Sequence, residues 1–599
     1  MKFAIVYFNK AAEKIAKKIA KKMEGEIYFS PPKETMQKLF KQGTAIIGIC
    51  ASGILIRFLA TFLNDKQNEP PVIAVSNDGA HVVPLLGGHH GANDLAQEIA
   101  DLFAGQAAIT TASNAQFSCA LDEPPMGYVM ADVALAKKAM VAVLNGEGIL
   151  LDGKADWFKN AGYEVLENAS DPQQVQGEAH SDLVDRKGVV KIAISEKTSD
   201  KNILTYHPKT LIIGVGCERY LPANELIELV EKVIKENKFA PHSIAAIASI
   251  DVKADEKAVN ELAAYYGVPL RLFSAAKLAN ENTPNPSEIV RQEVGTPSVA
   301  EACAIKAGEL IVEKQKSKRA TCAIGRAVKP IDVEKFGMAR GQLHIVGIGP
   351  GEEEQRTISV IKALKNSSDW VGYGFYLDLV ANLKLEQIEH RFPLGDEEKR
   401  VRHALELAAS GKNVSLICSG DGQIYAMAAL VFELLDARGK RALSENAKRV
   451  EVVSHSGISA LQMASSRVGA ILGHDFCAIS LSDLLTPKEA IISRLEAAAM
   501  GDFVTAFYNP RSKTRTDLLD KAKEIFLKFR SPNTPIIIAR SLGRKDEKVR
   551  IITLGEFDTS EVDMMCIVLF GSSNSKSFKR GDGKQVVFTP RGYDKKVSQ

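Results

Sequence analysis

The sequence has 599 residues, about the length of four typical domains. Charged residues make up 25% of the chain and hydrophobic residues 45%, with 44 glycines and 23 prolines, which excludes a mainly disordered protein. The formal net charge is only +3, so no overall field would recruit nucleic acid or an anionic membrane, and we predict neither as a partner.

The cysteines and the first residues indicate a reducing compartment. Eight cysteines are scattered along the chain without a C-x-x-C pair, which is typical of free thiols. The apolar start at residues 3–8 is too short for a signal peptide. The only stretch of membrane length, Ala45–Leu63, carries Arg57 near its centre and is interrupted by glycines. We therefore predict a cytoplasmic protein.

Short β-rich runs alternate with amphipathic helical runs from the first residue, which predicts an α/β fold with parallel sheets covered by helices. In the first cycle we expect strands at Lys2–Phe8, Ile27–Phe29, Ala45–Ile49, Pro71–Ser76 and Ala107–Thr111. We expect helices at Ala11–Met23, Thr35–Lys41, Ile54–Leu63 and Ala92–Phe103. This α/β unit fills residues 1–115.

The rest of the chain divides into four further segments. Residues 116–205 are the least regular and are predicted to form a separate intermediate module. A second α/β domain covers residues 206–327, beginning with the strand around Leu211–Val215. Residues 328–341 are polar, contain Pro330 and two glycines, and are predicted to be a linker. The last domain covers residues 342–599.

Four loops of the last domain each follow an apolar strand. The first is Gly349-Pro350-Gly351, and the others lie at Ser419–Tyr425, Ser454–Ala460 and Phe507–Arg515. Glycine turns at the carboxyl ends of strands let backbone amides approach a ligand, although a turn needed only for packing is an equal alternative for the first loop alone. Pro350 and the following glutamates depart from the dinucleotide fingerprint, which disfavours a nicotinamide cofactor. We expect the four loops to converge on one cleft.

Taken together, these motifs resemble the tetrapyrrole methylases that use S-adenosylmethionine. The run Gly473–Pro487 resembles the branch that methylates C17 of precorrin-3B or cobalt-factor III with ring contraction. The resemblance covers about residues 342–573 and implies a two-lobed fold and a homodimer formed through this half.

The resemblance implies a set of cofactor-binding residues. They are Gly349, Pro350, Gly351, Gly420, Asp421, Gly422, Ile424, Ser459, Ala460, Tyr508, Asn509 and Cys566. Glu352 stands where the family usually has Asp, and Gly422 where related enzymes often have Pro. A sulfonium methyl group is already activated, so alignment of the substrate and exclusion of water are the main tasks, and no catalytic triad is expected.

Three cations in the fourth loop are candidates for binding substrate carboxylates, because tetrapyrrole substrates carry acetate and propionate arms. They are Arg511, Lys513 and Arg515. The alternative is an ordinary solvated loop. For His455 and His474 we favour structural roles over proton transfer.

The segment Pro84–Asp94 crowds glycines and histidines into the turn before a helix. With Ala51-Ser52-Gly53-Ile54 and motifs of the 206–327 domain, it resembles cobalt-precorrin-5A hydrolase, which opens a ring lactone and releases a two-carbon aldehyde. The turn is one glycine shorter than usual in that family. We hypothesise that His89 acts as general base or orients water, and that Arg57, Lys66 and Lys253 bind substrate carboxylates. Adjacent histidines point apart, so zinc is disfavoured.

These observations predict a fused bifunctional enzyme of cobalamin synthesis. It would use S-adenosylmethionine, hold no protein-bound metal, and take small tetrapyrroles as substrates, with transient contacts to other corrin-pathway enzymes. The main alternative keeps the methyltransferase but makes the amino-terminal half a non-catalytic tetrapyrrole carrier. More distant alternatives are a methylase of another biosynthetic branch and a nicotinamide oxidoreductase.

Overall fold

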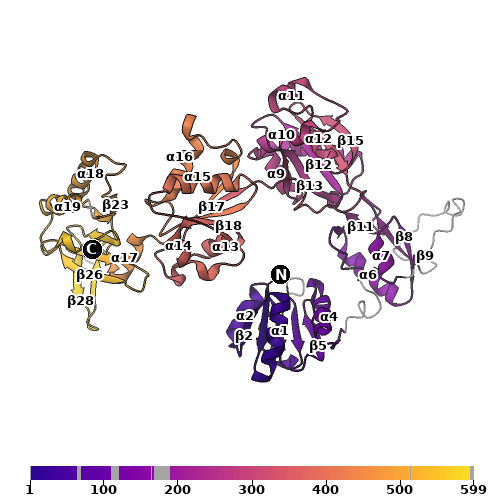
Figure 1. Ribbon diagram of the computed structural model, residues 1–599, viewed down its shortest axis with the longest axis horizontal. Helices are drawn as coiled ribbons and strands as arrows, with labels where there is room; N and C mark the ends of the chain where they lie inside the picture. The colour runs from indigo at the N-terminus through magenta and orange to yellow at the C-terminus, as the bar shows by residue number, and fades with distance from the viewer. Residues whose placement is uncertain are drawn as a thin grey trace. The chain divides into compact units, whose positions relative to one another are not determined.

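The computed structural model describes residues 2–63, 69–109, 120–163, 165–166, 189–512 and 515–593 (Figure 1). Lys66 and Lys513, two of the predicted substrate-binding residues, lie outside these ranges. The chain divides into two compact units. One contains residues 1–211, 232–245 and 327–331, and the other contains the remainder. Within the described ranges, the helices are too short or too polar to cross a membrane.

The first sheet has six strands in the order β2-β1-β3-β4-β5-β6. The strands are β1 (Phe3–Tyr7), β2 (Glu26–Phe29), β3 (Ala45–Ile49), β4 (Val72–Val75), β5 (His81–Leu86) and β6 (Gln106–Ala107). The helices are α1 (Glu13–Met23), α2 (Lys33–Lys41), α3 (Ser52–Leu59) and α4 (Ala92–Leu102). Two apolar clusters cover its two faces, which explains the continuous apolar run of β3.

Strand β5 departs from the predicted parallel sheet, because it runs antiparallel to β4. The Ser76–His81 turn reverses the chain with Gly79 at φ 77°, and the Ser76 N–H donates to the His81 carbonyl at 2.9 Å. An Asp-Gly pair is a strong hairpin signal that the strand-helix alternation concealed. Since Leu86 pairs with Val72 at the start of β4, the glycine turn after β5 lies at the amino-terminal edge of the sheet.

The described residues between 120 and 208 form a regular α/β module, although we expected this to be the least regular part. Its sheet has the order β7-β11-β10-β8-β9. The strands are β7 (Tyr128–Met130), β8 (Gly148–Asp152), β9 (Val165–Leu166), β10 (Val189–Ile194) and β11 (Leu204–Pro208), with helices α6 (Val133–Leu144) and α7 (Asp156–Asn160). Its core is aromatic, since Trp157 and Phe158 pack against the fully buried Tyr206.

A third sheet has the order β14-β13-β12-β16-β15. Its strands are β12 (Leu211–Cys217), β13 (Ile244–Ile250), β14 (Leu270–Phe273), β15 (Glu309–Lys316) and β16 (Ala320–Arg326). Its helices are α8 (Ala223–Glu236), α9 (Lys257–Tyr266), α10 (Ala275–Ala279), α11 (Glu288–Val294) and α12 (Val299–Ile305). The predicted linker is irregular, but Met338 pairs with Leu272 of β14 through two backbone hydrogen bonds of 2.8 and 2.9 Å.

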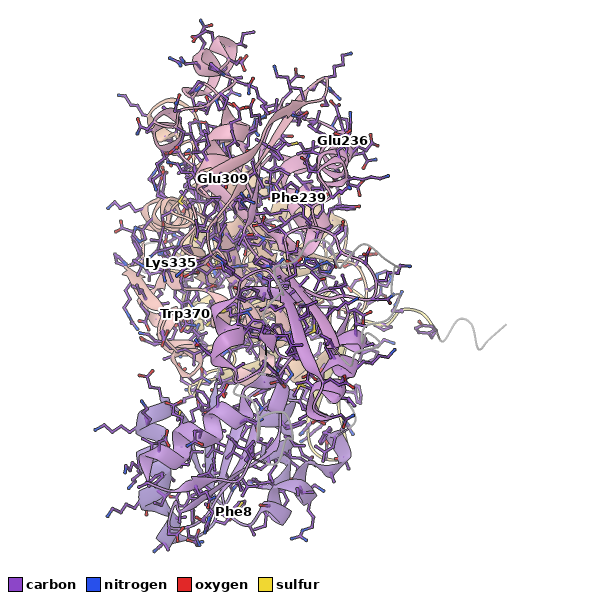
Figure 2. The ribbon with its side chains drawn as sticks, turned by 90° about the vertical axis from the view of Figure 1, so that its right-hand side faces the viewer. Phe8, Glu236, Phe239, Glu309, Lys335 and Trp370 are labelled. Carbon is purple, nitrogen blue, oxygen red and sulfur yellow. The ribbon has the colours of Figure 1, made fainter. Side chains whose placement is uncertain are left out.

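The next lobe is a five-stranded parallel sheet in the order β19-β18-β20-β17-β21. Its strands are β17 (Gln342–Gly347), β18 (Asp369–Tyr373), β19 (Ile388–Phe392), β20 (Asn413–Cys418) and β21 (Glu451–His455). Helices α13 (Ile358–Asn366) and α14 (Gly374–Leu379) cover one face, while α15 (Glu397–Ala408) and α16 (Met427–Asp436) cover the other (Figure 1). Trp370, labelled in Figure 2, is fully buried, and its indole N–H donates to the Leu364 carbonyl at 2.9 Å.

The last lobe has a mixed sheet in the order β23-β24-β27-β25-β26 and a small sheet in the order β22-β29-β28. The strands are β22 (Gly469–Ala470), β23 (Phe476–Ser480), β24 (Val504–Tyr508), β25 (Pro535–Arg540), β26 (Lys548–Thr553), β27 (Cys566–Phe570), β28 (Lys576–Lys579) and β29 (Gln585–Phe588). The helices are α17 (Ala460–Val468), α18 (Lys488–Met500) and α19 (Asp517–Leu527). The α/β fold class and the two-lobed carboxyl-terminal half are thereby confirmed.

Candidate functional site: four converging loops

The first two glycine loops are joined by backbone hydrogen bonds. Strand β17 leads into Gly349, whose N–H donates to the Gly420 carbonyl at 3.1 Å, and Gly420 donates back to Gly349 at 2.8 Å. Gly349 has φ 74° and Gly420 has φ 66°, which is backbone that a glycine adopts without strain. The turns after β17 and β20 are therefore held together at the carboxyl edge of the sheet.

Asp421 joins the third loop to the second. Its Oδ2 accepts the Gly457 N–H at 3.2 Å, and its Oδ1 accepts the Gln423 N–H at 2.8 Å. Gly457 lies so close to its neighbours that an added Cβ would be 2.2 Å from the carbonyl oxygens of both Gly347 and Gly420. Only glycine allows this approach, so the loop after β21 packs directly on the first two.

Tyr508 joins the fourth loop to the third. Its hydroxyl is hydrogen-bonded to Ser459 Oγ and accepts the Leu461 N–H at 3.2 Å. The Tyr425 ring lies 5.2 Å from the Tyr508 ring, centroid to centroid, and the Tyr425 hydroxyl donates to the Ala478 carbonyl at 2.8 Å. Burial raises the pKa of Tyr508, which keeps its hydroxyl neutral. All four predicted loops thus lie together and contact one another.

The other predicted cofactor residues lie in or next to these loops. Ala460 begins α17, Gly422 is buried against Ile345, and Ile424 is half-buried. Asn509 follows β24 with φ 50° and donates its side-chain amide to Ser480 Oγ at 3.0 Å. Cys566 begins β27, which pairs antiparallel with β24, and burial raises the pKa of its thiol to about 11. Pro350 lies between the first-loop glycines.

The two described cations of the fourth loop are held by protein groups. Arg511 Nη1 lies 3.5 Å from Asp520 Oδ1 and donates to the Thr516 carbonyl at 3.1 Å. Arg515 Nε lies 3.8 Å from Asp483 Oδ1, and its side chain is 16% exposed. Both arginines therefore contact groups of their own lobe. Their predicted role in binding substrate carboxylates stays a prediction.

The sequence interpretation missed Arg544. Its Cγ lies 3.3 Å from the position of an added Cβ on Gly351, and its guanidinium lies 4.9 Å from the centroid of the Phe375 ring. The buried Nε has no acceptor, and no carboxylate forms an ion pair with this arginine among the described residues. An unpaired guanidinium beside the first glycine turn is suited to a ligand carboxylate. In the sequence, Arg544 is one of several charged residues in the run Arg544–Glu547, and nothing there marked it as a candidate for ligand binding.

Glu352, the departure from the family pattern, has a structural contact. Its Oε1 lies 2.6 Å from Arg467 Nη2, and Arg467 Nε lies 2.7 Å from Glu547 Oε1. Hydrogen bonding to Arg467 lowers the pKa of Glu547. This network joins the first loop to α17 and to the turn before β26. Glu352, whose side chain is longer than that of the usual Asp, therefore takes part in a contact between the two lobes.

The histidines near these loops have protein partners. His455 Nε2 is 3.0 Å from His344 Nδ1, and His455 Nδ1 is 2.6 Å from Ser359 Oγ. Burial lowers the pKa of both histidines, so both are neutral near pH 7. His474 Nδ1 accepts the Asp475 N–H at 2.8 Å. These contacts agree with the structural roles that the sequence favoured.

In the amino-terminal half, the predicted residues come from two different sheets and from both edges of the first sheet. The turn that contains His89 (Gly88–His90) follows β5 at the amino-terminal edge of the sheet, whereas α3, with Ser52 and Arg57, begins after β3 at the carboxyl edge. Lys253 follows β13 in the third sheet, where its Nζ lies 3.5 Å from Glu256 Oε2 with 10% of its side chain exposed. The His89 turn and the start of α3 therefore lie at different edges of the first sheet.

The carboxyl-terminal half matches a known class of enzyme, the tetrapyrrole methylases. Residues 342–558 match the family "Tetrapyrrole (Corrin/Porphyrin) Methylases", and residues 34–114 and 211–325 match "Cobalamin synthesis G N-terminal" and "Cobalamin synthesis G C-terminus". The predicted fusion is confirmed.

Several named proteins are similar to the carboxyl-terminal half of this chain. A precorrin-3B C(17)-methyltransferase from Sinorhizobium sp is 40% identical over 42% of this chain and 97% of its own length. A cobalt-factor III methyltransferase from Priestia megaterium is 40% identical over 43% of this chain and 46% of its own length, so the chain spans about half of that relative. The crystal structure of the methyltransferase CobJ has 36% identity and a TM-score of 0.38, covering 42% of this chain and all of the other. The chain belongs to the tetrapyrrole methylase family, in a fusion with both cobalamin synthesis G domains.

Proposed function

We propose that the carboxyl-terminal half transfers a methyl group from S-adenosylmethionine to C17 of precorrin-3B or cobalt-factor III, with ring contraction. The observation that carries this proposal is the convergence of the four loops through the Gly349–Gly420, Asp421–Gly457 and Ser459–Tyr508 hydrogen bonds. Such an arrangement presents backbone groups and neutral hydroxyls rather than a charged base, which suits alignment of an activated sulfonium methyl with a ring carbon.

The residues of these loops fit the cofactor. The closely packed glycines bring the strand ends together, and the half-exposed Tyr425 and the partly buried Tyr508 offer ring surface beside them. S-adenosylmethionine would supply the methyl group. We propose that Asp421 holds the second and third loops in the geometry that binds it, and that Arg544 binds a carboxylate of the tetrapyrrole.

We further propose that the amino-terminal half opens the lactone of cobalt-precorrin-5A with release of acetaldehyde. The match to both cobalamin synthesis G domains supports this proposal. We retain His89 as the proposed base and Arg57, Lys66 and Lys253 as the proposed carboxylate ligands. We also propose a cytoplasmic homodimer formed through the methylase half and transient contacts with other corrin-pathway enzymes. Light scattering of the purified chain tests the dimer.

One observation favours a second candidate for the amino-terminal half. The His89 turn and the Arg57 helix lie at opposite edges of the same sheet, which suits binding better than a compact catalytic group. A non-catalytic tetrapyrrole carrier is therefore the alternative.

The experiment uses the full chain. It is incubated with methyl-labelled S-adenosylmethionine and with precorrin-3B or cobalt-factor III, and the products are weighed by mass spectrometry. One added methyl group on a contracted ring supports the methyltransferase, and unlabelled product refutes it. A second incubation with cobalt-precorrin-5A measures acetaldehyde. Release that depends on the chain supports the hydrolase, whereas binding without release supports the carrier.

A further inference from the structure

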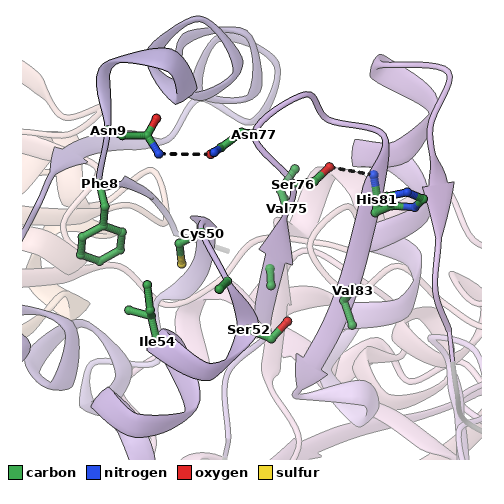
Figure 3. Close-up of a pocket in the computed structure, with 12 residues that line it drawn as sticks. Phe8, Asn9, Cys50, Ser52, Ile54, Val75, Ser76, Asn77, His81 and Val83 are labelled. Carbon is green, nitrogen blue, oxygen red and sulfur yellow. Dashed lines mark hydrogen bonds between the residues drawn. The ribbon is translucent and has the colours of Figure 1, made fainter.

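A cavity of about 340 Å³ lies at the carboxyl edge of the first sheet (Figure 3). Phe8 follows β1, Cys50 and Ser52 follow β3, and Asn77 follows β4, so the cavity is built by the ends of three neighbouring parallel strands. The chain leaves β1 toward β2 and leaves β3 toward β4, in opposite directions from the middle of the sheet. Open α/β sheets bind their ligands at such a point.

The lining of the cavity is partly apolar and carries no acidic or basic chain other than His81. Phe8 and Ile54 supply apolar surface, and Asn9 Nδ2 donates to Asn77 Oδ1 at 3.4 Å across the opening (Figure 3). The hydroxyl of Ser52 has no hydrogen-bond partner among the described residues. Asp78, which follows the lining residue Asn77, has its Oδ1 engaged by Ser76 Oγ and the Ala80 N–H. The cavity thus offers hydrogen-bond donors that the described chain leaves unused.

Arg57 adds a positive charge to α3, the helix whose Ser52 and Ile54 line the cavity. It lies one turn along α3, and its Nη2 is 3.2 Å from the position of an added Cβ on Gly53, so the side chain folds back over the start of the helix. Arg57 is exposed, and it forms no ion pair with another described residue. Gly53 leaves the space that the guanidinium occupies. A cation that is held in position without a protein counter-charge is suited to a ligand carboxylate.

We propose that this cavity binds one carboxylate arm of the tetrapyrrole substrate, with Ser52 as hydrogen-bond donor, Arg57 as counter-charge, and Phe8 and Ile54 against the carbon chain of the arm. The volume lies near the lower end of the roughly 300–1,000 Å³ of small-molecule sites, which suits an arm and the ring edge that bears it rather than a whole macrocycle. The inference rests on the proposed function of the amino-terminal half and adds a position for the substrate that the His89 turn does not share.

Cys50 provides a readout inside the cavity. Its thiol is half-buried there, and burial raises the pKa of Cys50 to about 11, so alkylation is slow but measurable at alkaline pH. The full chain is alkylated with and without uroporphyrin III, an octacarboxylate tetrapyrrole, and Cys50 labelling is measured by peptide mass spectrometry. Cys477, a partly buried thiol of β23 that packs against the core of the last lobe and whose pKa is also raised by burial, serves as the internal control.

We expect the labelling rate of Cys50 to fall about tenfold when the probe is present at ten times its dissociation constant, with Cys477 unchanged. Arg57→Gln should raise the probe concentration needed for protection at least tenfold. Gly53→Ala should also weaken protection, because the added methyl group displaces the guanidinium while the charge remains. Lys21→Gln is the matched control, since it removes a cation from the far end of α1.

Unchanged Cys50 labelling at the highest soluble probe concentration would overturn the inference. Equal protection in the wild-type chain and in Arg57→Gln would do so as well. Acetaldehyde release from cobalt-precorrin-5A is scored separately. Release without protection of Cys50 would leave the proposed hydrolase standing and remove only this subsite.

Discussion

Replacing Gly457 with alanine should disable methyl transfer while the rest of the chain stays folded. The added Cβ would lie 2.2 Å from two backbone carbonyl oxygens, those of Gly347 and Gly420. These oxygens belong to a strand end and a loop that are hydrogen-bonded in place, so the third loop has to move by about 1 Å to restore a normal contact. Overpacking of this kind costs about 1–3 kcal/mol. A displacement of about 1 Å in a positioning element lowers a rate by about 100-fold.

The assay measures transfer of labelled methyl from S-adenosylmethionine and equilibrium binding of S-adenosylhomocysteine to the full chain. Gly581→Ala is the matched control, because an added Cβ there meets nothing within 4 Å. Far-ultraviolet circular dichroism and acetaldehyde release by the other half check that the variant is folded. Full methyl transfer and unchanged cofactor affinity in Gly457→Ala would refute the placement of the cofactor between these loops.

Three further predictions address the same half. Asp421→Asn should weaken S-adenosylhomocysteine binding about tenfold to hundredfold, measured by calorimetry, because it removes a charge-assisted acceptor worth about 1.5–3 kcal/mol from the Gly457 N–H; unchanged affinity contradicts this role. Arg544→Gln should raise KM for the tetrapyrrole about tenfold or more and change kcat much less. A tenfold fall in kcat with unchanged KM would argue against carboxylate binding by Arg544. Burial lowers the pKa of His455 below its ordinary value of 6.5. Below pH 6.5 the unfolded chain therefore binds more protons at this histidine than the folded chain does. The stability that this group contributes above pH 6.5 is lost as the pH falls toward the pKa of the folded state. Urea unfolding at neutral and acidic pH checks this, and His455→Gln should lose less stability over the same range.

The sequence by itself determined the fold class, the fusion of the domains and the four loops that lie together in the last domain. Apolar strands followed by glycine turns are local patterns, and parallel strands bring their carboxyl ends to one edge wherever they pair. Convergence of the loops at Gly349, Gly420 and Ser459 could therefore be predicted from strand positions alone. The family resemblance added Tyr508, which follows another strand end.

Tertiary structure decided the contacts that depend on residues far apart in sequence. The reversal of β5 placed the His89 turn at the opposite edge from Arg57, because one tight turn at Gly79 changes the direction of a strand without disturbing the alternation of strands and helices. Asp520 engages Arg511, while Arg544 is left without a carboxylate partner among the described residues. Whether a cation is free for a ligand depends on which acidic side chains the fold brings near it. The sequence shows which residues are charged, but only the folded chain shows which of them are paired with an opposite charge.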